Sequence, residues 1–199
     1  MPKTKSSAQS PNVNVGIPHM PALYTSQHKK KFLPWSHAEE RLINSRSYWI
    51  CTARPDGRPH SIPVWGMWVD GALYFGTARD ARKAKNIAHN PAVSVHLESG
   101  DDVVILEGEA VEADVSGKKL RAKLDRECKR KYNMPLLVMP ESICYRVRPR
   151  VVLAWLEKEF PFNSTRWEFQ TNGVSDEHEG QRRSAPAPEC CSGSRVPDM

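Results

Sequence analysis

The sequence predicts a mainly β domain of the α+β type, built as a small antiparallel barrel with helices at its periphery. Segments rich in β-branched and aromatic residues are separated by two tight-turn signals, Pro55-Asp56-Gly57 and Asp70-Gly71. The helical segments between them are short, and no internal repeat is apparent. The expected strands lie near 47–54, 58–69, 72–77, 92–99 and 101–114, with two more between 143 and 157.

A short helix should open the folded part of the chain, followed by three strands. Ser36 is followed three residues later by Glu39, which is the spacing of a capping box at a helix start. The strands over 47–54, 58–69 and 72–77 come next. Because their connecting turns are tight, we expect these strands to pair as an antiparallel meander.

A second helix is expected over 81–89, directly after the third strand. Asp80 is available as its N-cap, and the pair Asn90-Pro91 should end it. Two strands of alternating polarity should follow, one on each side of a Ser-Gly turn.

A third helix and two final strands complete the pattern. Over 116–132, Leu120, Leu124 and Cys128 recur at helical spacing, with basic side chains on the other faces. Two short strands split by Pro149 should come last. The order β-β-β-α-β-β-α-β-β predicts an antiparallel barrel of six or seven strands whose ends are plugged by helices.

The composition divides the chain into one folded domain and two tails. Residues 1–31 contain no acidic side chain and are rich in Pro, Ser and Asn, so we expect a disordered basic tail. Residues 170–199 are polar and rich in Pro and Ser, and we expect a second disordered tail. The domain between them, 32–169, is long enough to bury one hydrophobic core.

The formal net charge of +6 is partly a property of the first tail and does not by itself indicate nucleic-acid binding. A nucleic-acid-binding domain would rest only on this tail and on the basic helix over 118–131, so we rank it last. We therefore expect a small-molecule ligand rather than nucleic acid. The lysines of the tail are Lys3, Lys5, Lys29, Lys30 and Lys31.

The chain offers no uninterrupted apolar run long enough to span a bilayer and no signal peptide, so we expect no membrane partner. Three cysteines are scattered through core segments, and Cys190 and Cys191 are adjacent in the second tail. This usage does not resemble a disulfide framework, and it indicates free thiols in a cytoplasmic protein. We interpret the Cys190-Cys191 pair as incidental rather than as a metal or lipid site.

The absence of several motifs argues against a hydrolytic enzyme or an acid–base enzyme that works without a bound cofactor. The sequence has no zinc signature, P-loop, Gly-x-Ser-x-Gly elbow or Gly-x-Gly-x-x-Gly helix start. His60 and His96 fall on expected strands, where a hydrogen-bonded structural histidine is the default interpretation. No catalytic residue can be assigned and no metal site is expected. A redox reaction in this domain would need a bound cofactor.

The helix over 81–89 opens with Arg82 and Lys83, although a helix start is already partly positive. The free N–H groups of such a start form an anion site, and two added cations strengthen it for phosphate. Thr77 just before the loop offers a hydroxyl to the same anion. A solvated basic face is the alternative, and spacing alone favours it.

The segment "YFGTARDARKAKNIAHNPAVSV" resembles the phosphate-binding segment of the pyridoxamine 5'-phosphate oxidase-like split-barrel family. In that family a strand ends in Thr, an Arg-Lys pair opens the next helix, and Asn-Pro leads into another strand. "ARPDGRPHSIPVWGMWVDG", "DVVILEGEAVEAD" and "STRWEF" fit the same family, so the likeness spans roughly 36 to 169. The run Pro63-Val64-Trp65 is similar to the flavin/deazaflavin oxidoreductase branch, many members of which use coenzyme F420.

The resemblance implies a split barrel with a flavin-type cofactor. The phosphate would be held by Arg82 and Lys83 with Thr77 and the loop N–H groups, and the ring would lie along the strand that contains Pro63. A strand carrying Pro63 cannot be a fully paired central strand, because proline donates no ladder hydrogen bond. The implied cofactor-binding residues are His60, Ser61, Pro63, Val64, Trp65, Thr77, Ala78, Arg82, Lys83 and Trp167.

The resemblance also implies a function. We expect an oxidoreductase that transfers a hydride between F420, or alternatively FMN, and a small organic acceptor. The other possibility is a binding protein of the same fold that holds FMN, haem or a tetrapyrrole without turnover. Members of the family form the cofactor cleft between two subunits, so a homodimer is expected.

Overall fold

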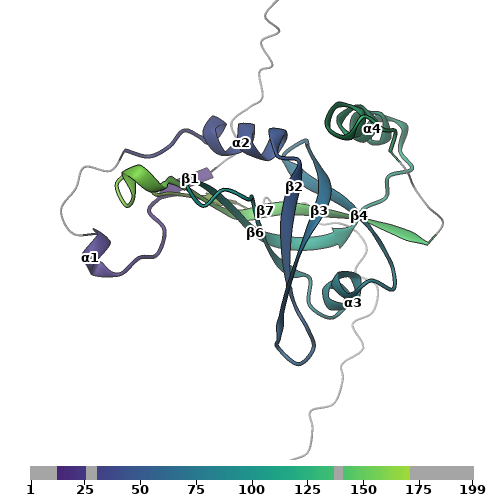
Figure 1. The fold of residues 1–199 in the computed structure, drawn as a ribbon, viewed down its shortest axis with the longest axis horizontal. Helices are drawn as coiled ribbons and strands as arrows, with labels where there is room; N and C mark the ends of the chain where they lie inside the picture. The colour runs from purple at the N-terminus through teal and green to yellow at the C-terminus, as the bar shows by residue number, and fades with distance from the viewer. Residues whose placement is uncertain (1–12, 26–30, 137–140, 171–199) are drawn as a thin grey trace, which may run out of the picture.

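A computed structural model describes residues 13–25, 31–136 and 141–170 of the 199-residue chain (Figure 1). In chain order the elements are β1 (Val13–Gly16), α1 (Ala22–Thr25), α2 (Trp35–Asn44), β2 (Ser47–Ala53), β3 (Pro59–Val69), β4 (Ala72–Ala78), α3 (Arg82–His89), β5 (Ala92–His96), β6 (Asp102–Glu112), α4 (Lys118–Tyr132), β7 (Ser142–Leu156), the 3-10 turn η1 (Glu157–Glu159) and β8 (Thr165–Phe169).

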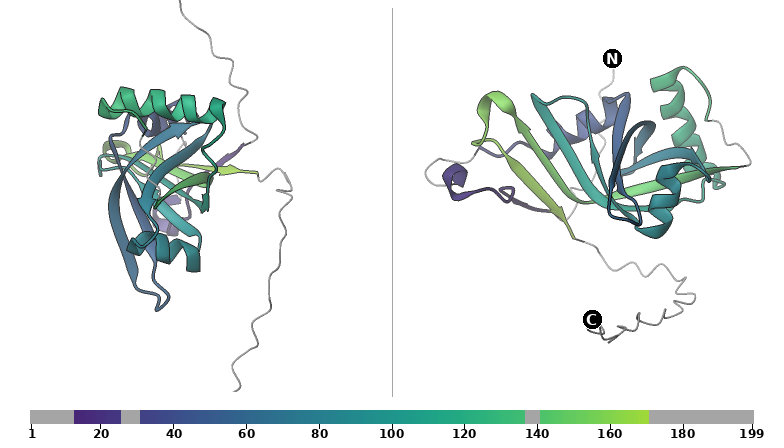
Figure 2. Two further views of the ribbon diagram at one scale, coloured as in Figure 1. Left: turned by 90° about the vertical axis from the view of Figure 1, so that its right-hand side faces the viewer. Right: turned by 60° about the horizontal axis from the view of Figure 1, so that its bottom comes forward.

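The strands form one antiparallel sheet in the order β1-β8-β7-β4-β3-β2-β5-β6. β6 also pairs with β7, so the six strands β2 to β7 close into a barrel, and β8 and β1 extend the sheet beyond it. Figures 1 and 2 show α2 and α4 on one side of the barrel and α3 on the other. The prediction of a mainly β antiparallel barrel with peripheral helices is confirmed.

The barrel is split between β3 and β4. These strands pair only from Val69–Ala72 to Gly66–Phe75. Beyond that point, β3 pairs with β2 from Pro59 to Trp65, and the end of β4 pairs with β7. Two strand edges therefore diverge beside the start of α3, and their facing backbone groups are available to a ligand.

The interior and the outer face of the barrel carry separate apolar clusters. The interior cluster is the larger one, and α4 packs on the outer face of β3, β4 and β7 to form the second. The interior includes Tyr48, Ile50, Phe75, Leu106, Val147 and Trp167, and the second cluster includes Met67, Tyr74, Leu124, Cys128 and Tyr132. Within the described residues, no helix is long and apolar enough to cross a membrane.

β7 is one strand of 15 residues, so the prediction of two short strands split by Pro149 was wrong. The register with β6 shifts here, because Glu107 pairs with Val151 whereas Gly108 pairs with Pro149. The extra residue, Arg150, makes a β-bulge, and a bulge tolerates a residue that donates no ladder hydrogen bond.

Both predicted helix caps were wrong as well. α2 follows Pro34 and α3 follows Ala81, and neither helix start has a side-chain cap hydrogen bond. α2 starts at Trp35, whose ring packs edge-on against Trp167 with the centroids 5.6 Å apart, so tertiary packing fixes this start instead of Ser36. At α3, Asp80 leaves the first turn uncapped.

Part of the segment expected to be a disordered tail is ordered. Val13 to Gly16 form β1, which pairs with β8, and Val13 packs against the core. Val15, the second valine of this segment, is 50% exposed, so the contact rests on Val13. Residues 22–25 of the same segment form α1, and the remaining expectations for the tails, including those for Cys190 and Cys191, lie outside the described residues.

The close approach of β6 to the bulge yields a stability prediction. A Cβ on Gly108 would lie 2.2 Å from the carbonyl oxygen of Arg148, so backbone would have to move. We expect Gly108→Ala to lower the free energy of unfolding by roughly 1–3 kcal/mol in a urea titration. Gly16→Ala, where a Cβ meets nothing within 4 Å, should change it by less than about 0.5 kcal/mol. Equal effects of the two changes would contradict the close approach.

Candidate anion and cofactor site

Four basic side chains from three segments gather beside the split. Arg54 follows β2, His60 lies near the start of β3, and Arg82 and Lys83 open α3. Burial lowers the pKa of His60 most, and the charges of Arg54, Lys83 and Arg82 lower it further. The charges of the other three side chains therefore act on His60, and the four together are called here the cation cluster.

A buried polar chain fastens α3 to the strands that carry this cluster. Asn86 is fully buried, and its Nδ2 donates to Oγ1 of Thr52 at 2.9 Å. Oγ1 of Thr52 in turn lies 3.3 Å from the carbonyl oxygen of His60, to which it donates. This chain fixes the start of α3 relative to the β2–β3 hairpin and so holds the cations together.

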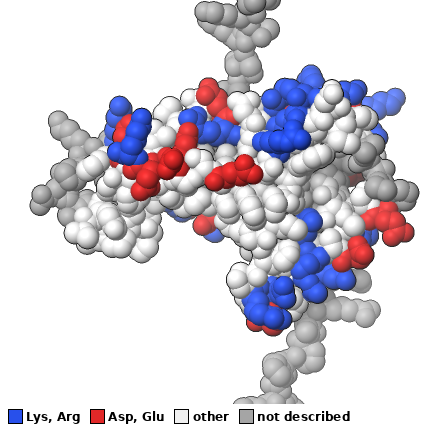
Figure 3. Space-filling model, viewed as in Figure 1, with Lys and Arg blue, Asp and Glu red and all other residues white. Residues whose placement is uncertain are grey.

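The cations of the cluster have no ion-pair partner among the described residues, although the Asp56 carboxylate, which is bonded to Arg58, acts on Arg54 electrostatically. Nearby, Arg58 is paired with Asp56 and Arg79 with Glu112, whereas Arg54, Arg82 and Lys83 have no such ion pair. Lys and Arg side chains gather over α3 and the end of the hairpin (Figure 3).

Unpaired nitrogens in the cluster reinforce this picture. Nε of Arg54 and Nδ1 of His60 are buried and lack a hydrogen-bond partner in the described part of the chain. Burial lowers the pKa of Lys83. A buried donor such as Nε of Arg54 is normally satisfied, so it indicates a missing acceptor, and Nδ1 of His60 is a second such donor in the tautomer that carries the proton there. An anion would supply both that acceptor and the counter-charge, and the expectation of a hydrogen-bonded structural histidine does not hold for Nδ1 of His60.

The start of α3 adds free backbone donors to the same place. Its first turn contains no acidic residue and its cap, Ala81, offers no side chain. The residues that lead into it from β4 are Thr77, which is half-buried, and Ala78, which is exposed. An uncapped helix start with adjacent cations can bind a phosphate through N–H groups and charge together.

The expected ring-binding residues of β3 divide between two faces. His60 and Val64 pair with the buried Thr52 and Tyr48 and point toward the interior. The side chains on the outer face, Ser61, Pro63 and Trp65, are exposed. Five residues of a strand span about 16 Å, so His60 and Trp65 lie at opposite ends of any ligand that follows β3.

Trp65 is held by the end of α4. Its ring stacks on Tyr132 with centroids 4.6 Å apart, and the guanidinium of Arg46 lies 5.6 Å from the centroid of the Trp65 ring. The Tyr132 hydroxyl accepts from the Gly66 N–H at 2.8 Å and donates to the Arg46 carbonyl. Trp65 remains 51% exposed, so it presents a fixed aromatic surface.

Trp167 does not join this site within the chain. It is only 2% exposed and lies in the interior cluster against Trp35. Its large apolar ring fills the space beneath α2, which accounts for its burial. The expectation that Trp167 lies near the cofactor stays a prediction, and its side chain is buried in the interior cluster.

Sequence reasoning missed two contributors, Arg54 and Asn86. Arg54 precedes the Pro55-Asp56-Gly57 turn, and its only sequence signal was its place opposite the start of the next strand. Asn86 lies one helical turn after Lys83, on the face that carries the apolar Ile87 and Ala84. A polar residue on that face was a signal for a buried hydrogen bond.

The fold and the cation cluster together define a split-barrel protein with a group of basic side chains at the split. The sequence profile of the family described as pyridoxamine 5'-phosphate oxidase matches residues 35–156. Because this match covers more than half of the chain, the chain belongs to that family. No curated protein matches it.

Solved structures show the same fold. A conserved hypothetical protein from Mycobacterium tuberculosis is 22% identical, with a TM-score of 0.55 over 66% of this chain and 92% of the other. A FAD-binding protein from Mesorhizobium loti is 20% identical, with a TM-score of 0.51 over 69% and 96%. A structure described as an F420 reductase is 25% identical over 57% and 94%, but its TM-score of 0.44 is too low to bear on the cofactor.

The effect of the neighbouring charges on the pKa of His60 can be tested in the protein without any ligand. Arg54→Gln removes the charge that lowers the pKa of His60 most among the three, so this pKa should rise when measured by NMR titration of the imidazole. Arg58→Gln is the matched control, because the Arg58 guanidinium is neutralised by Asp56 at 2.6 Å. A His60 pKa that stays the same in Arg54→Gln would show that the cluster is not assembled as described.

Proposed function

We propose that this protein is an oxidoreductase that binds a phosphorylated flavin-type cofactor at the split and uses it to transfer a hydride to a small organic acceptor. The observation that carries the proposal is the cation cluster, because it combines uncompensated positive charge with buried donors that lack acceptors. Membership of the pyridoxamine 5'-phosphate oxidase family supports a cofactor of this class.

The residues present fit the phosphate of such a cofactor. Arg82 and Lys83 would hold it by charge, with the free N–H groups of α3 and the hydroxyl of Thr77 completing the contacts. Arg54 and His60 would approach from the hairpin, and Nδ1 of His60 would gain the acceptor it lacks. Ala78 leaves room at the strand end because it carries no bulky side chain.

A flat ring would lie along the unpaired edge of β3. Pro63 donates no hydrogen bond, so contacts there would come from the carbonyl groups of Ser61, Pro63 and Trp65 and from the N–H groups of Ser61 and Trp65, which share one strand edge. The backbone of Val64 faces the opposite edge, where β3 pairs with β2, and its side chain is buried. When bound in its reduced form, the cofactor supplies the hydride.

Among cofactors, we propose F420 with FMN as the alternative. Both carry a flat tricyclic ring and a phosphate, and F420 continues into an oligoglutamate tail. Lys85 is exposed on α3 and offers a cation to that tail. Arg79 offers less to that tail, because its guanidinium is already paired with Glu112.

A second copy of this chain would complete the cleft. The outer face of β2, β3 and β5 carries half-buried and exposed apolar groups: Trp49 stacks on His96 with centroids 6.0 Å apart, and Pro63 and Trp65 are exposed beside them. An apolar sheet face of this kind commonly marks an interface. In an isologous dimer, the ring lying along β3 would be covered by the partner.

Lys83→Ala tests the phosphate contact. Loss of one charge-assisted contact costs roughly 1.5–3 kcal/mol, so affinity for FMN and for F420 should fall about ten- to a hundredfold in parallel fluorescence titrations. Lys119→Ala is the matched control, because Lys119 is also the second residue of a helix and is exposed. If Lys83→Ala lowers the unfolding midpoint but leaves affinity unchanged, the phosphate assignment fails.

Sedimentation equilibrium tests the dimer. The cofactor-loaded protein should be a dimer at micromolar concentration, and Pro63→Lys should shift it toward monomer because two like charges would be brought into one interface. Ala122→Lys, which adds the same charge on the exposed side of α4, should leave the dimer intact. A cofactor-loaded wild-type monomer would overturn the proposal.

Turnover separates the enzyme from a binding protein. The bound chromophore should bleach with a reductant and recover when a quinone or an enone is added. A protein that binds the chromophore but shows no recovery with quinones, enones or tetrapyrroles would be the non-catalytic alternative. If the protein binds neither cofactor, both the oxidoreductase proposal and the binding-protein alternative are wrong.

A further inference from the structure

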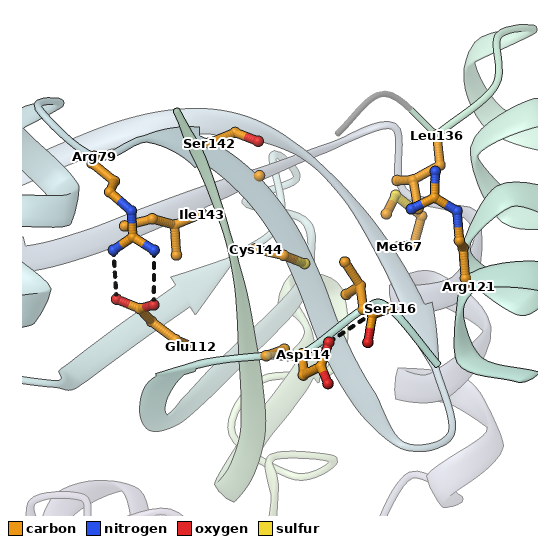
Figure 4. A pocket seen from close by; sticks show the side chains of 13 residues that line it. Met67, Arg79, Glu112, Asp114, Ser116, Arg121, Leu136, Ser142, Ile143 and Cys144 are labelled. Atoms are coloured by element: carbon orange, nitrogen blue, oxygen red, sulfur yellow. Dashed lines mark hydrogen bonds and ion pairs between the residues drawn. The ribbon is translucent and has the colours of Figure 1, made fainter. Parts of the chain in front are cut away.

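A pocket of about 310 Å³ lies on the outer face of the barrel, between α4 and the end of β6 (Figure 4). Gly76, which lines it, is followed directly by Thr77, and successive strand residues point to opposite faces. The pocket therefore lies on the other side of β4 from the Thr77 hydroxyl. Its volume is at the lower end of the range for small-molecule sites.

The inside of the pocket is apolar. Its floor is formed by Met67, Gly76 and Cys144 from three neighbouring strands, and Val115 and Leu136 line its sides. Burial raises the pKa of the Cys144 thiol to about 11, so the thiol is neutral. A Cβ on Gly76 would meet nothing closer than 4.0 Å, so the space above β4 is open.

The charged side chains at the rim differ in whether they already have an ion-pair partner. Arg79 and Glu112 pair with each other at 3.2 and 3.3 Å and neutralise one end. On the opposite side, Arg121 reaches in from α4 (Figure 4), and its guanidinium makes no hydrogen bond or ion pair with the described residues. Hydrogen bonds from Ser116, first from its side chain and then from its N–H at 2.8 Å, lower the pKa of the Asp114 carboxyl and keep it charged.

We propose that this pocket binds a small carboxylic acid with an apolar body, whose carboxylate contacts Arg121 and whose body lies on Met67 and Cys144. Arg121 is the one lining cation of the described residues that is not already paired. Guanidinium and carboxylate match in geometry as well as in charge. Asp114 opposes an anion at the same rim. This assignment does not rest on the proposed cofactor.

The probe for the test is 2-naphthoate, followed through the methyl NMR signals of Met67 and Val115. These two signals should shift saturably, while that of Ile105, on a different part of the sheet, should not. Arg121→Gln should weaken binding roughly tenfold, and Asp114→Asn should strengthen it. Lys119→Gln, which removes a charge from the same helix, should leave the affinity within about twofold.

A substitution that fills the pocket provides a second, independent test of the proposal. Gly76→Leu places a side chain in the open space, and Gly76 does not have a positive φ that would strain it. Binding of 2-naphthoate should be abolished, while Lys83→Ala should leave it unchanged because that lysine belongs to the cation cluster. Unmoved Met67 and Val115 signals in the wild-type protein, or equal affinities in wild type and Arg121→Gln, would overturn the proposal. If Gly76→Leu fails to fold, Arg121→Gln decides.

Discussion

The separation of β3 from β4 after Gly66 and Phe75 is the constraint on which the rest of the structure depends. Gly66 occupies the fork because a Cβ there would lie 2.8 Å from Leu73 and 3.0 Å from the carbonyl oxygen of Tyr74. Beyond the fork, β3 follows β2 while β4 follows β7, and α3 begins at Arg82, shortly after β4 ends at Ala78. The fork therefore exposes a strand edge beside a helix start, which is the arrangement that a flat phosphorylated ligand requires.

The cation cluster shows how the fold maintains charges that repel one another. The buried chain from Asn86 through Thr52 to His60 fixes α3 against the hairpin, so Arg82 and Lys83 cannot move away from Arg54 without breaking these hydrogen bonds. Packing thus maintains an arrangement that its own electrostatics disfavour, and this cost is relieved when an anion binds. At the other end of β3, Lys131 and Tyr132 of α4 hold the Gly66 backbone and the stacked Trp65 ring in place. Burial lowers the pKa of Lys131 to about 8.

Much of this fold was predictable because tight turns and alternating strands are local features. The three strands around the turns at 55–57 and 70–71 and the helix at 82–89 lie within one or two residues of their expected bounds. The wrong predictions concern tertiary effects: Pro149 is tolerated at a bulge set by β6, and Trp35 starts α2 by packing on Trp167. In the site, Arg82 and Lys83 could be predicted as candidate phosphate-binding residues because they lie at a helix start. Arg54 and Asn86 were not, because their roles arise only when the hairpin and α3 come together.

The central claim is that the cation cluster recognises the phosphate of the cofactor, and it is tested most directly by comparing ligands that differ only in that group. Calorimetric titration of the wild-type protein with FMN and riboflavin makes the comparison, and F420 against its ribityl deazaflavin, which lacks the glutamate tail as well as the phosphate, is the second pair. Several charge-assisted contacts are at stake, so the phosphorylated member of the pair that binds should be favoured by about a hundredfold or more. Equal affinities within a pair would contradict the account, because they would mean that the ring binds without the cluster.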